Sequence, residues 1–189
     1  MSNVLKSLFV LGSTHHEASL ALREDIALTA KQVSELQKEL HSLENIQECI
    51  VVNTCNRLEV YGLANTPDVE DIIRNHVCKY NGVSRKLLDA HSFWRTNLDV
   101  LQHAFEVSAG LDSQMVGETD ILGQMKQAYQ HARETNCTGL VLNRLFEKSF
   151  QAAKSARTKT KIARGQVSIG NIAVDLGNRI FGDLCNSRV

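Results

Sequence analysis

The sequence has little of several features that mark special classes of protein. It contains a single proline, Pro67, and proline disrupts helix interiors, so this scarcity suits a helix-rich chain. It has no apolar run of about 18 residues, so no membrane-spanning helix is predicted. Lys plus Arg equals Asp plus Glu, at 21 each. The resulting zero net charge argues against a strongly basic, sequence-independent nucleic-acid binder.

Paired cysteines and a glycine-rich nucleotide motif are also missing. No C-x-x-C occurs and the number of cysteines is odd, so neither a disulfide framework nor a zinc knuckle is predicted. No G-x-G-x-x-G occurs, so no dinucleotide site can be assigned. The apolar run before Gly12 is too short for a signal peptide, and we expect a protein of the cytosolic type. The cysteines are Cys49, Cys55, Cys78, Cys137 and Cys185.

Strand and helix patterns alternate in the first half of the chain. Short runs rich in apolar residues predict strands over residues 7–12, 48–53, 58–63 and 87–96. Helical spacing predicts helices over residues 21–43, with a break near Thr29, and over residues 66–82. The order strand, helix, strand, strand, helix, strand matches a ferredoxin-like split βαβ arrangement.

Only helices are predicted in the second half, over residues 97–108, 119–136, 140–161 and 167–184. The fold class is therefore predicted as α+β, with a ferredoxin-like βαββαβ antiparallel sheet and a helical C-terminal extension. Residues 144–164 hold seven basic residues and one acidic residue, Glu147. A solvated helix face is the simpler interpretation of that charge, and a nucleic-acid contact is the other.

The stretch VVNTCNRLEVYG, residues 51–62, interrupts two strand patterns with a cysteine and an arginine. A cysteine at a strand end is usually a small buried hydrophobe. Polar Thr54 and Asn56 flank Cys55, however, and favour a turn at the edge of the sheet. Arg57 follows two residues later, and a nearby guanidinium favours the nucleophilic thiolate. Because arginine also binds carboxylates, the pair suggests covalent catalysis on an acidic acyl substrate.

A second group of polar residues lies between residues 101 and 128. A single histidine on a helix, here His103, is usually structural. A glycine-bounded loop over residues 110–117 carries Asp112 and Ser113, and helix capping alone would explain the acidic and hydroxyl residues that follow it. The other polar residues of this group are Glu118, Thr119, Asp120 and Gln124.

These segments together resemble one enzyme family. They are TCNRLE (residues 54–59), GLDSQMVGETDILGQMKQA (110–128) and ARTKTKIARGQVSIGNIAVDL (156–176), with LGSTHHEASLALRED (11–25) near the start. The chain resembles glutamyl-tRNA reductase, which initiates tetrapyrrole synthesis from glutamate. The resemblance is spread over nearly the whole chain.

The resemblance implies a role for each of these residues. Cys55 would attack the aminoacyl ester of glutamyl-tRNA to form a glutamyl thioester, which NADPH reduces to glutamate-1-semialdehyde. Thr54, Asn56 and Arg57 would line the glutamate pocket, with Arg57 on the side-chain carboxylate. His103 would assist at the ester carbonyl. The remaining positions implied to contact the substrate are Ser113, Glu118, Thr119, Asp120 and Gln124.

The sequence departs from the family pattern at some positions. Residues 118–120 read Glu-Thr-Asp where Glu-Pro-Gln is usual, and the extra charge of Asp120 is expected to weaken glutamate binding. Ser19 stands where proline is common, and Glu106 stands where a basic residue is common.

The resemblance also implies further domains and partners. Residues 1–157 are expected to be the catalytic, glutamyl-tRNA-binding domain. Residues 158–189 are expected to be a helical linker and the start of an NADPH-binding domain that is absent here, as in a catalytic-domain fragment. The family dimerises through a later part of the chain, so a monomer is expected, with glutamyl-tRNA as partner and glutamate-1-semialdehyde aminomutase as a further candidate.

A function of another class remains open. A non-catalytic tRNA-binding or regulatory module that keeps the fold would suit the basic stretch and the missing reductase half. The presence of both Cys55 and Arg57 favours the enzyme.

Overall fold

The computed structural model describes residues 8–162 and 169–182. The strands are β1 (Leu8–Thr14), β2 (Ile46–Asn53), β3 (Arg57–Ala64) and β4 (Phe93–Thr96). The helices are α2 (Leu20–Ile26), α3 (Ala30–His41), α4 (Glu70–Asn81), α5 (Arg85–Ala90), α6 (Leu98–Ala109), α7 (Asp120–Glu134), α8 (Leu140–Lys159) and α9 (Ile169–Phe181). Ser7, the last residues of the predicted 167–184 helix and Cys185 lie outside the described residues.

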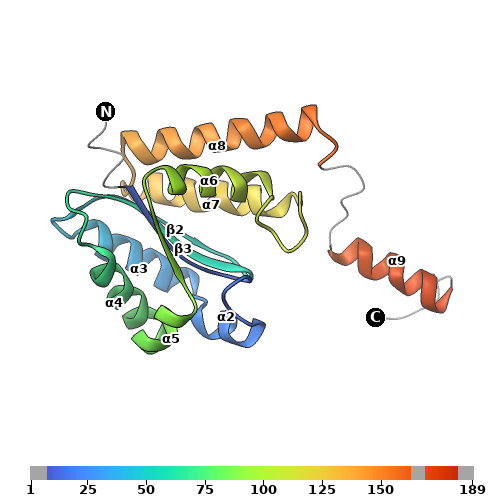
Figure 1. The fold of residues 1–189 in the computed structure, drawn as a ribbon, viewed down its shortest axis with the longest axis horizontal. Helices are drawn as coiled ribbons and strands as arrows, with labels where there is room; N and C mark the ends of the chain where they lie inside the picture. The colour runs from blue at the N-terminus through green and yellow to red at the C-terminus, as the bar shows by residue number, and fades with distance from the viewer. Residues whose placement is uncertain (1–7, 163–168, 183–189) are drawn as a thin grey trace.

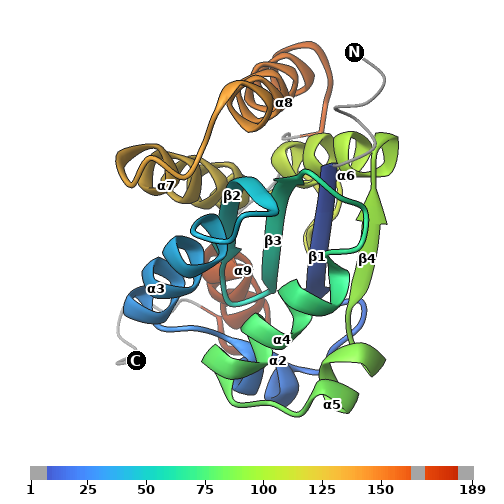
Figure 2. The ribbon, with the colours of Figure 1, turned by 90° about the vertical axis from the view of Figure 1, so that its left-hand side faces the viewer.

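The four strands form one sheet in the order β2-β3-β1-β4, and every neighbouring pair is antiparallel (Figure 2). Helices α2 and α3 connect β1 to β2, and α4 and α5 connect β3 to β4. This order confirms the predicted ferredoxin-like βαββαβ sheet. In the register of the sheet, Thr14 lies opposite Arg57 and Gly12 lies opposite Glu59.

The sheet is covered on both faces (Figure 1). Phe9 and Val60 point to the face covered by α3 and α4, whereas Val10 and Tyr61 point to the face covered by α6, α7 and α8. The strands are therefore buried on both sides, which explains why they read as continuous apolar runs. The predicted helical extension is part of the core up to α8, while α9 lies apart from both layers (Figure 1).

Two predicted boundaries are wrong. The strand predicted over residues 87–96 is a short helix, α5, followed by the four-residue strand β4. The side chain of Ser84 accepts a hydrogen bond from the Leu87 amide and starts that helix. Arg57, predicted in the connection between strands, is the first residue of β3. The predicted break near Thr29 is confirmed, because Thr29 and Gln32 form a capping box there.

No helix within residues 8–162 and 169–182 is long and apolar enough to cross a membrane.

Candidate active site around Cys55

Cys55 lies at the tip of a tight turn between β2 and β3. The Thr54 amide donates to the Arg57 carbonyl at 2.8 Å, and the Thr54 hydroxyl accepts from the amides of Asn56 and Arg57. The polar neighbours of Cys55 therefore build the turn. Cys55 itself is exposed. The predicted turn at the edge of the sheet is present.

Arg57 points away from solvent, into the layer beneath α6. Residues at alternate positions of a strand share one face, so Arg57, Glu59 and Tyr61 line up along β3. The Arg57 Nη1 donates to Glu59 Oε1 at 2.8 Å, and the Tyr61 hydroxyl donates to Glu59 Oε2 at 2.7 Å. All three side chains are buried.

Asp112 reaches the same guanidinium from the loop between α6 and α7. Its Oδ2 accepts from Arg57 Nη1 at 3.0 Å, and its backbone carbonyl accepts from Arg57 Nη2. Two carboxylates, those of Asp112 and Glu59, therefore face one guanidinium. Cys55 lies in the turn and Arg57 in the strand, and the guanidinium that the sequence predicted near the thiol is paired with these two carboxylates.

The charges in this cluster hold one another ionised. Burial raises the pKa of Glu59, but the neighbouring His103 and Arg57 outweigh it and lower that pKa from 4.5 to about 2. Burial works against the charge of Arg57, but Glu59 and Asp112 outweigh it and raise the pKa of Arg57. A buried ion pair of this kind requires all of its partners, because removing one leaves an uncompensated charge.

His103, on α6, is fully buried and lies on the far side of Glu59. Its Nε2 is 2.9 Å from Glu59 Oε1, and its Nδ1 is 2.9 Å from Arg95 Nη1. A guanidinium can only donate, so Nδ1 accepts and Nε2 carries the proton that goes to Glu59. Both ring nitrogens are therefore occupied, and His103 connects to Arg57 through Glu59.

The loop that carries Asp112 is closed by glycines. Gly110 and Gly117 both have positive φ, of 76° and 85°, and the Gly117 amide donates to the Gly110 carbonyl at 2.7 Å. A Cβ on Gly117 would lie 2.4 Å from the carbonyl oxygen of Ile162, so backbone packs directly on backbone there. Glycine is needed at Gly117 for its conformation and for this close approach.

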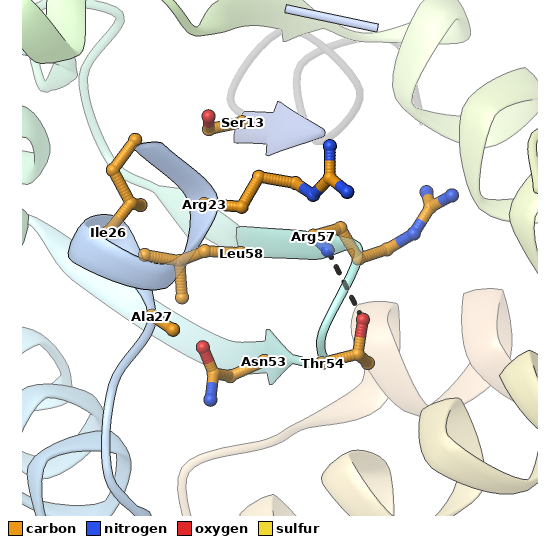
Figure 3. A pocket seen from close by; sticks show the side chains of 8 residues that line it. All are labelled: Ser13, Arg23, Ile26, Ala27, Asn53, Thr54, Arg57 and Leu58. Carbon is orange, nitrogen blue, oxygen red and sulfur yellow. Dashed lines mark hydrogen bonds between the residues drawn. The ribbon is translucent and has the colours of Figure 1, made fainter. Parts of the chain in front are cut away.

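Arg23 of α2 and His15, which directly follows β1, border the turn. Arg23 Nε donates to the Cys55 carbonyl at 3.4 Å, and the side chains of Arg23 and Arg57 extend in the same direction (Figure 3). The His15 amide donates to the Asn56 carbonyl at 3.1 Å. Burial lowers the pKa of His15, and the neighbouring His16 and Arg57 lower it further. A neutral imidazole beside this turn is able to accept a proton.

Three buried polar atoms from the segments that meet at Asp112 have no hydrogen-bond partner among the described residues. They are His15 Nδ1, Arg57 Nε and Ser113 Oγ. Buried polar groups are normally satisfied, so a group of orphans calls for an explanation such as a ligand. The pocket beside Arg57 measures only about 10 Å³, room for about one water molecule. This pocket, which Arg23 and Asn53 also line, is too small for a ligand the size of glutamate.

The remaining predicted site residues lie outside this buried cluster. Thr119 and Asp120 are exposed at the start of α7, and Thr119 makes no side-chain capping bond. The Glu118 carbonyl accepts from Arg157 Nη2 at 2.7 Å. Gln124 lines a separate groove of about 310 Å³ that also includes Asn53.

A metal is not a good fit for the cluster. Three possible ligand atoms, one each from Glu59, His103 and Asp112, lie within 4.8 Å of one another. The Arg57 guanidinium, however, contacts both carboxylates, and its positive charge takes the place that a cation would need.

Sequence reasoning gave no role to Glu59, Asp112, Arg95 or His15. The alternation of Arg57, Glu59 and Tyr61 along one strand was a usable signal for Glu59. No local signal identifies Asp112 or Arg95, because their partners are distant along the chain.

Cys55 is expected to react with iodoacetamide before the other described cysteines. Cys49 and Cys137 are buried, and burial raises the pKa of the Cys49 thiol and of the half-buried Cys78 thiol. Mass mapping of the labelled protein near neutral pH measures the order of reaction. If Cys49, Cys78 or Cys137 is labelled first, accessibility at the turn does not determine the reactivity.

The chain is similar to known proteins over most of its length. Residues 11–160 match the family model described as "Glutamyl-tRNAGlu reductase, N-terminal domain". Over 186 residues the chain is 39% identical to the glutamyl-tRNA reductase of Geobacter sulfurreducens, covering 97% of this chain and 42% of that protein. It is 37% identical over 182 residues to that of Akkermansia muciniphila, covering 95% of this chain and 53% of that protein.

A solved structure has the same fold. The glutamyl-tRNA reductase from Methanopyrus kandleri superposes with a TM-score of 0.72 at 28% identity, covering 94% of this chain and 41% of that one. The chain thus spans about half or less of the length of these relatives.

Proposed function

Because the chain belongs to the glutamyl-tRNA reductase family, we propose that it transfers glutamate from glutamyl-tRNA to Cys55. The exposed thiol is the nucleophile. Its sulfur forms a bond to the ester carbonyl carbon, and the ribose oxygen of the tRNA leaves with the proton that the thiol gives up. The products are a glutamyl thioester on the protein and free tRNA.

The observation that carries this proposal is the group of orphan atoms around Arg57, which lies two residues after Cys55. Arg57 has a buried Nε–H without a partner among the described residues, and Ser113 has a hydroxyl in the same condition. A carboxylate accepts hydrogen bonds from both kinds of donor. These atoms suit the side-chain carboxylate of glutamate, and the turn residues Thr54 and Asn56 border the place where it would bind.

Asp112 already occupies both terminal nitrogens of Arg57, so a substrate carboxylate would either share the guanidinium with Asp112 or replace it. The Arg57 side chain is 1% exposed and that of Asp112 is 20% exposed, so Asp112 is the partner that can be displaced toward solvent. Glu59, fully buried, would stay on Arg57 and keep the guanidinium in place.

His103 has a positioning role in this proposal. Its ring contacts Glu59, which in turn contacts Arg57. His103 therefore orients the Arg57 guanidinium through Glu59. Direct assistance at the ester carbonyl would require it to give up one of its two partners. Glu118, Thr119, Asp120 and Gln124 stay predicted substrate contacts. The carboxylate of Glu118 suits the α-ammonium group of glutamate, whereas that of Asp120 is still expected to weaken binding.

NADPH does not fit the residues present in this chain. The 189 residues contain no G-x-G-x-x-G, and the pocket beside Arg57 is far too small for a dinucleotide. The family implies that NADPH supplies the hydride that reduces the thioester. The chemistry proposed for this chain ends at the thioester and its hydrolysis.

Trapping of the thioester tests the proposal. The protein is incubated with glutamyl-tRNA carrying radiolabelled glutamate, quenched in acid, and separated under denaturing conditions. Label is expected on the wild type and on Cys78→Ser, to be absent from Cys55→Ser, and to be released by neutral hydroxylamine, which cleaves thioesters. Binding of the tRNA by the wild type with no label on protein would instead support the non-catalytic tRNA-binding module.

Arg57→Lys is expected to slow thioester formation roughly 10- to 100-fold. Lysine keeps the charge but loses the planar fork that contacts Glu59, Asp112 and the substrate together. Losing a hydrogen bond between charged groups costs about 1.5–3 kcal/mol, which is this factor in rate. Single-turnover trapping measures the rate, with Arg85→Lys on the surface as control. A rate within twofold of wild type would show that Arg57 does not hold the carboxylate.

A further inference from the structure

The C-terminal end of α8 is attached to the loop that holds Arg57. The Arg157 Nη2 donates to the Glu118 carbonyl at 2.7 Å. Just past the helix, Ile162 packs its carbonyl against the backbone of Gly117. A continuous set of contacts therefore runs from α8 through the loop and Asp112 to Arg57, two residues from Cys55.

This end of α8 carries positive charge that the described part of the protein does not neutralise. Lys154, Lys159 and Lys161 are exposed, and none forms an ion pair within residues 8–162 and 169–182. Other lysines do form ion pairs; Lys79, for example, pairs with Glu39 at 2.7 Å. Lys154, Lys159 and Lys161 lie within about two turns of one another around the end of α8 and just after it, rather than along one stripe of the helix. They are named the basic face here and are available to an outside anion.

Helix α2, on the other side of Cys55, has one basic and two acidic residues, so its net charge is negative. Arg23 of α2 contacts the Cys55 carbonyl, and the next residues of α2, Glu24 and Asp25, are exposed acids. A polyanion that ends at Cys55 is repelled on the α2 side and attracted on the α8 side. The two sides differ although the chain as a whole has no net charge.

We propose that the basic face binds the phosphates of the tRNA whose ester Cys55 attacks. This inference rests on the proposed function and specifies its docking surface. The reacting ester lies at the 3′ end of the RNA, so the last nucleotides and the acceptor stem must leave Cys55 across one of these two sides. Lysine contacts to phosphate give affinity without base specificity and make binding dependent on salt.

Salt-dependent binding of deacylated glutamate-accepting tRNA tests the proposal. The variant Lys154→Gln/Lys159→Gln/Lys161→Gln is compared with Lys31→Gln/Lys38→Gln/Lys86→Gln, which removes exposed lysines from α3 and α5. The first is expected to weaken binding about 10-fold or more and to reduce the slope of log K against log salt by about 2 to 3. The second is expected to bind like wild type.

A substrate without phosphates separates this proposal from the proposed function. The α-benzyl thioester of glutamate can acylate Cys55 by thioester exchange, and mass spectrometry measures the adduct. Wild type and the basic-face variant are expected to acylate at equal rates, because the lysines do not touch the glutamate.

Three results would overturn the docking surface. They are unchanged tRNA binding by the basic-face variant, equal losses in the two triple variants, and no tRNA binding by wild type. If either of the first two occurs while wild type is still acylated, the docking surface is wrong and the proposed function stands. If wild type neither binds tRNA nor is acylated, the proposed function fails as well.

Discussion

Glutamyl-tRNA mixed with this chain is expected to be hydrolysed slowly to glutamate and free tRNA, and Cys55→Ala is expected to abolish that hydrolysis. The thioester on Cys55 has one fate when no hydride donor is positioned beside it. Water attacks the acyl carbon, the carbon–sulfur bond breaks, and the thiol takes a proton and is restored. Without the sulfur no acyl intermediate forms.

The expected loss is large because the nucleophile acts together with the groups around it. Removing the nucleophile from such a unit commonly costs several powers of ten, so we expect a decrease of roughly 10³-fold or more. The release of labelled glutamate above the spontaneous rate measures it. Cys78→Ala, which alters a half-buried cysteine of α4, is the control and should hydrolyse like wild type.

Addition of NADPH gives a second readout for the same reaction. Hydride transfer needs the donor held close to the acyl carbon, and positioning supplies much of the rate. No semialdehyde is therefore expected from the 189-residue chain even with NADPH in excess. Semialdehyde formation would mean that a nucleotide site exists in these residues, and undiminished hydrolysis by Cys55→Ala would mean that Cys55 is not the nucleophile.

Glu59→Gln is expected to destabilise the protein by about 3–5 kcal/mol at pH 7. The side chain is fully buried and accepts hydrogen bonds from Arg57, Tyr61 and His103. An amide of the same shape leaves the buried guanidinium short of one negative charge, and breaking a buried pair from one side costs about this much. Urea unfolding at pH 7 measures the difference.

Glu59 should also account for part of the loss of folding stability in acid. The pKa of Glu59 is lowered from 4.5 to about 2 in the folded protein, so its ionised form stabilises the fold at any pH above 4.5. That contribution, on the order of 3 kcal/mol, is lost as the pH falls from about 5 toward 2. Wild type should therefore lose more stability over this interval than Glu59→Gln.

Glu35→Gln is the matched control for both measurements. Glu35 pairs with Lys31 on the surface of α3 at 3.7 Å, and exposed pairs of this kind contribute about 0.5 kcal/mol or less. If Glu59→Gln is as stable as Glu35→Gln, or loses stability in acid in parallel with wild type, the buried cluster does not stabilise the fold as argued.

The sequence by itself determined the elements and their order. Apolar runs placed the strands of the sheet, and cap and turn signals placed the helix break at Thr29. These signals are local, because strand and helix periods and caps depend on residues only a few positions apart. They failed for residues 87–90, which form a short apolar run that suits either a strand or a helix. The cap formed by Ser84 decides for the helix.

The partners of the site residues were decided by the tertiary structure alone. The motif around Cys55 predicted a turn and an arginine close to it, but not that Asp112, 55 positions after Arg57, neutralises that arginine. Nor did the sequence place His103 behind Glu59, or the end of α8 against the loop. Such contacts depend on strand register and on which helices cover which face of the sheet, and short-range patterns carry no information about either.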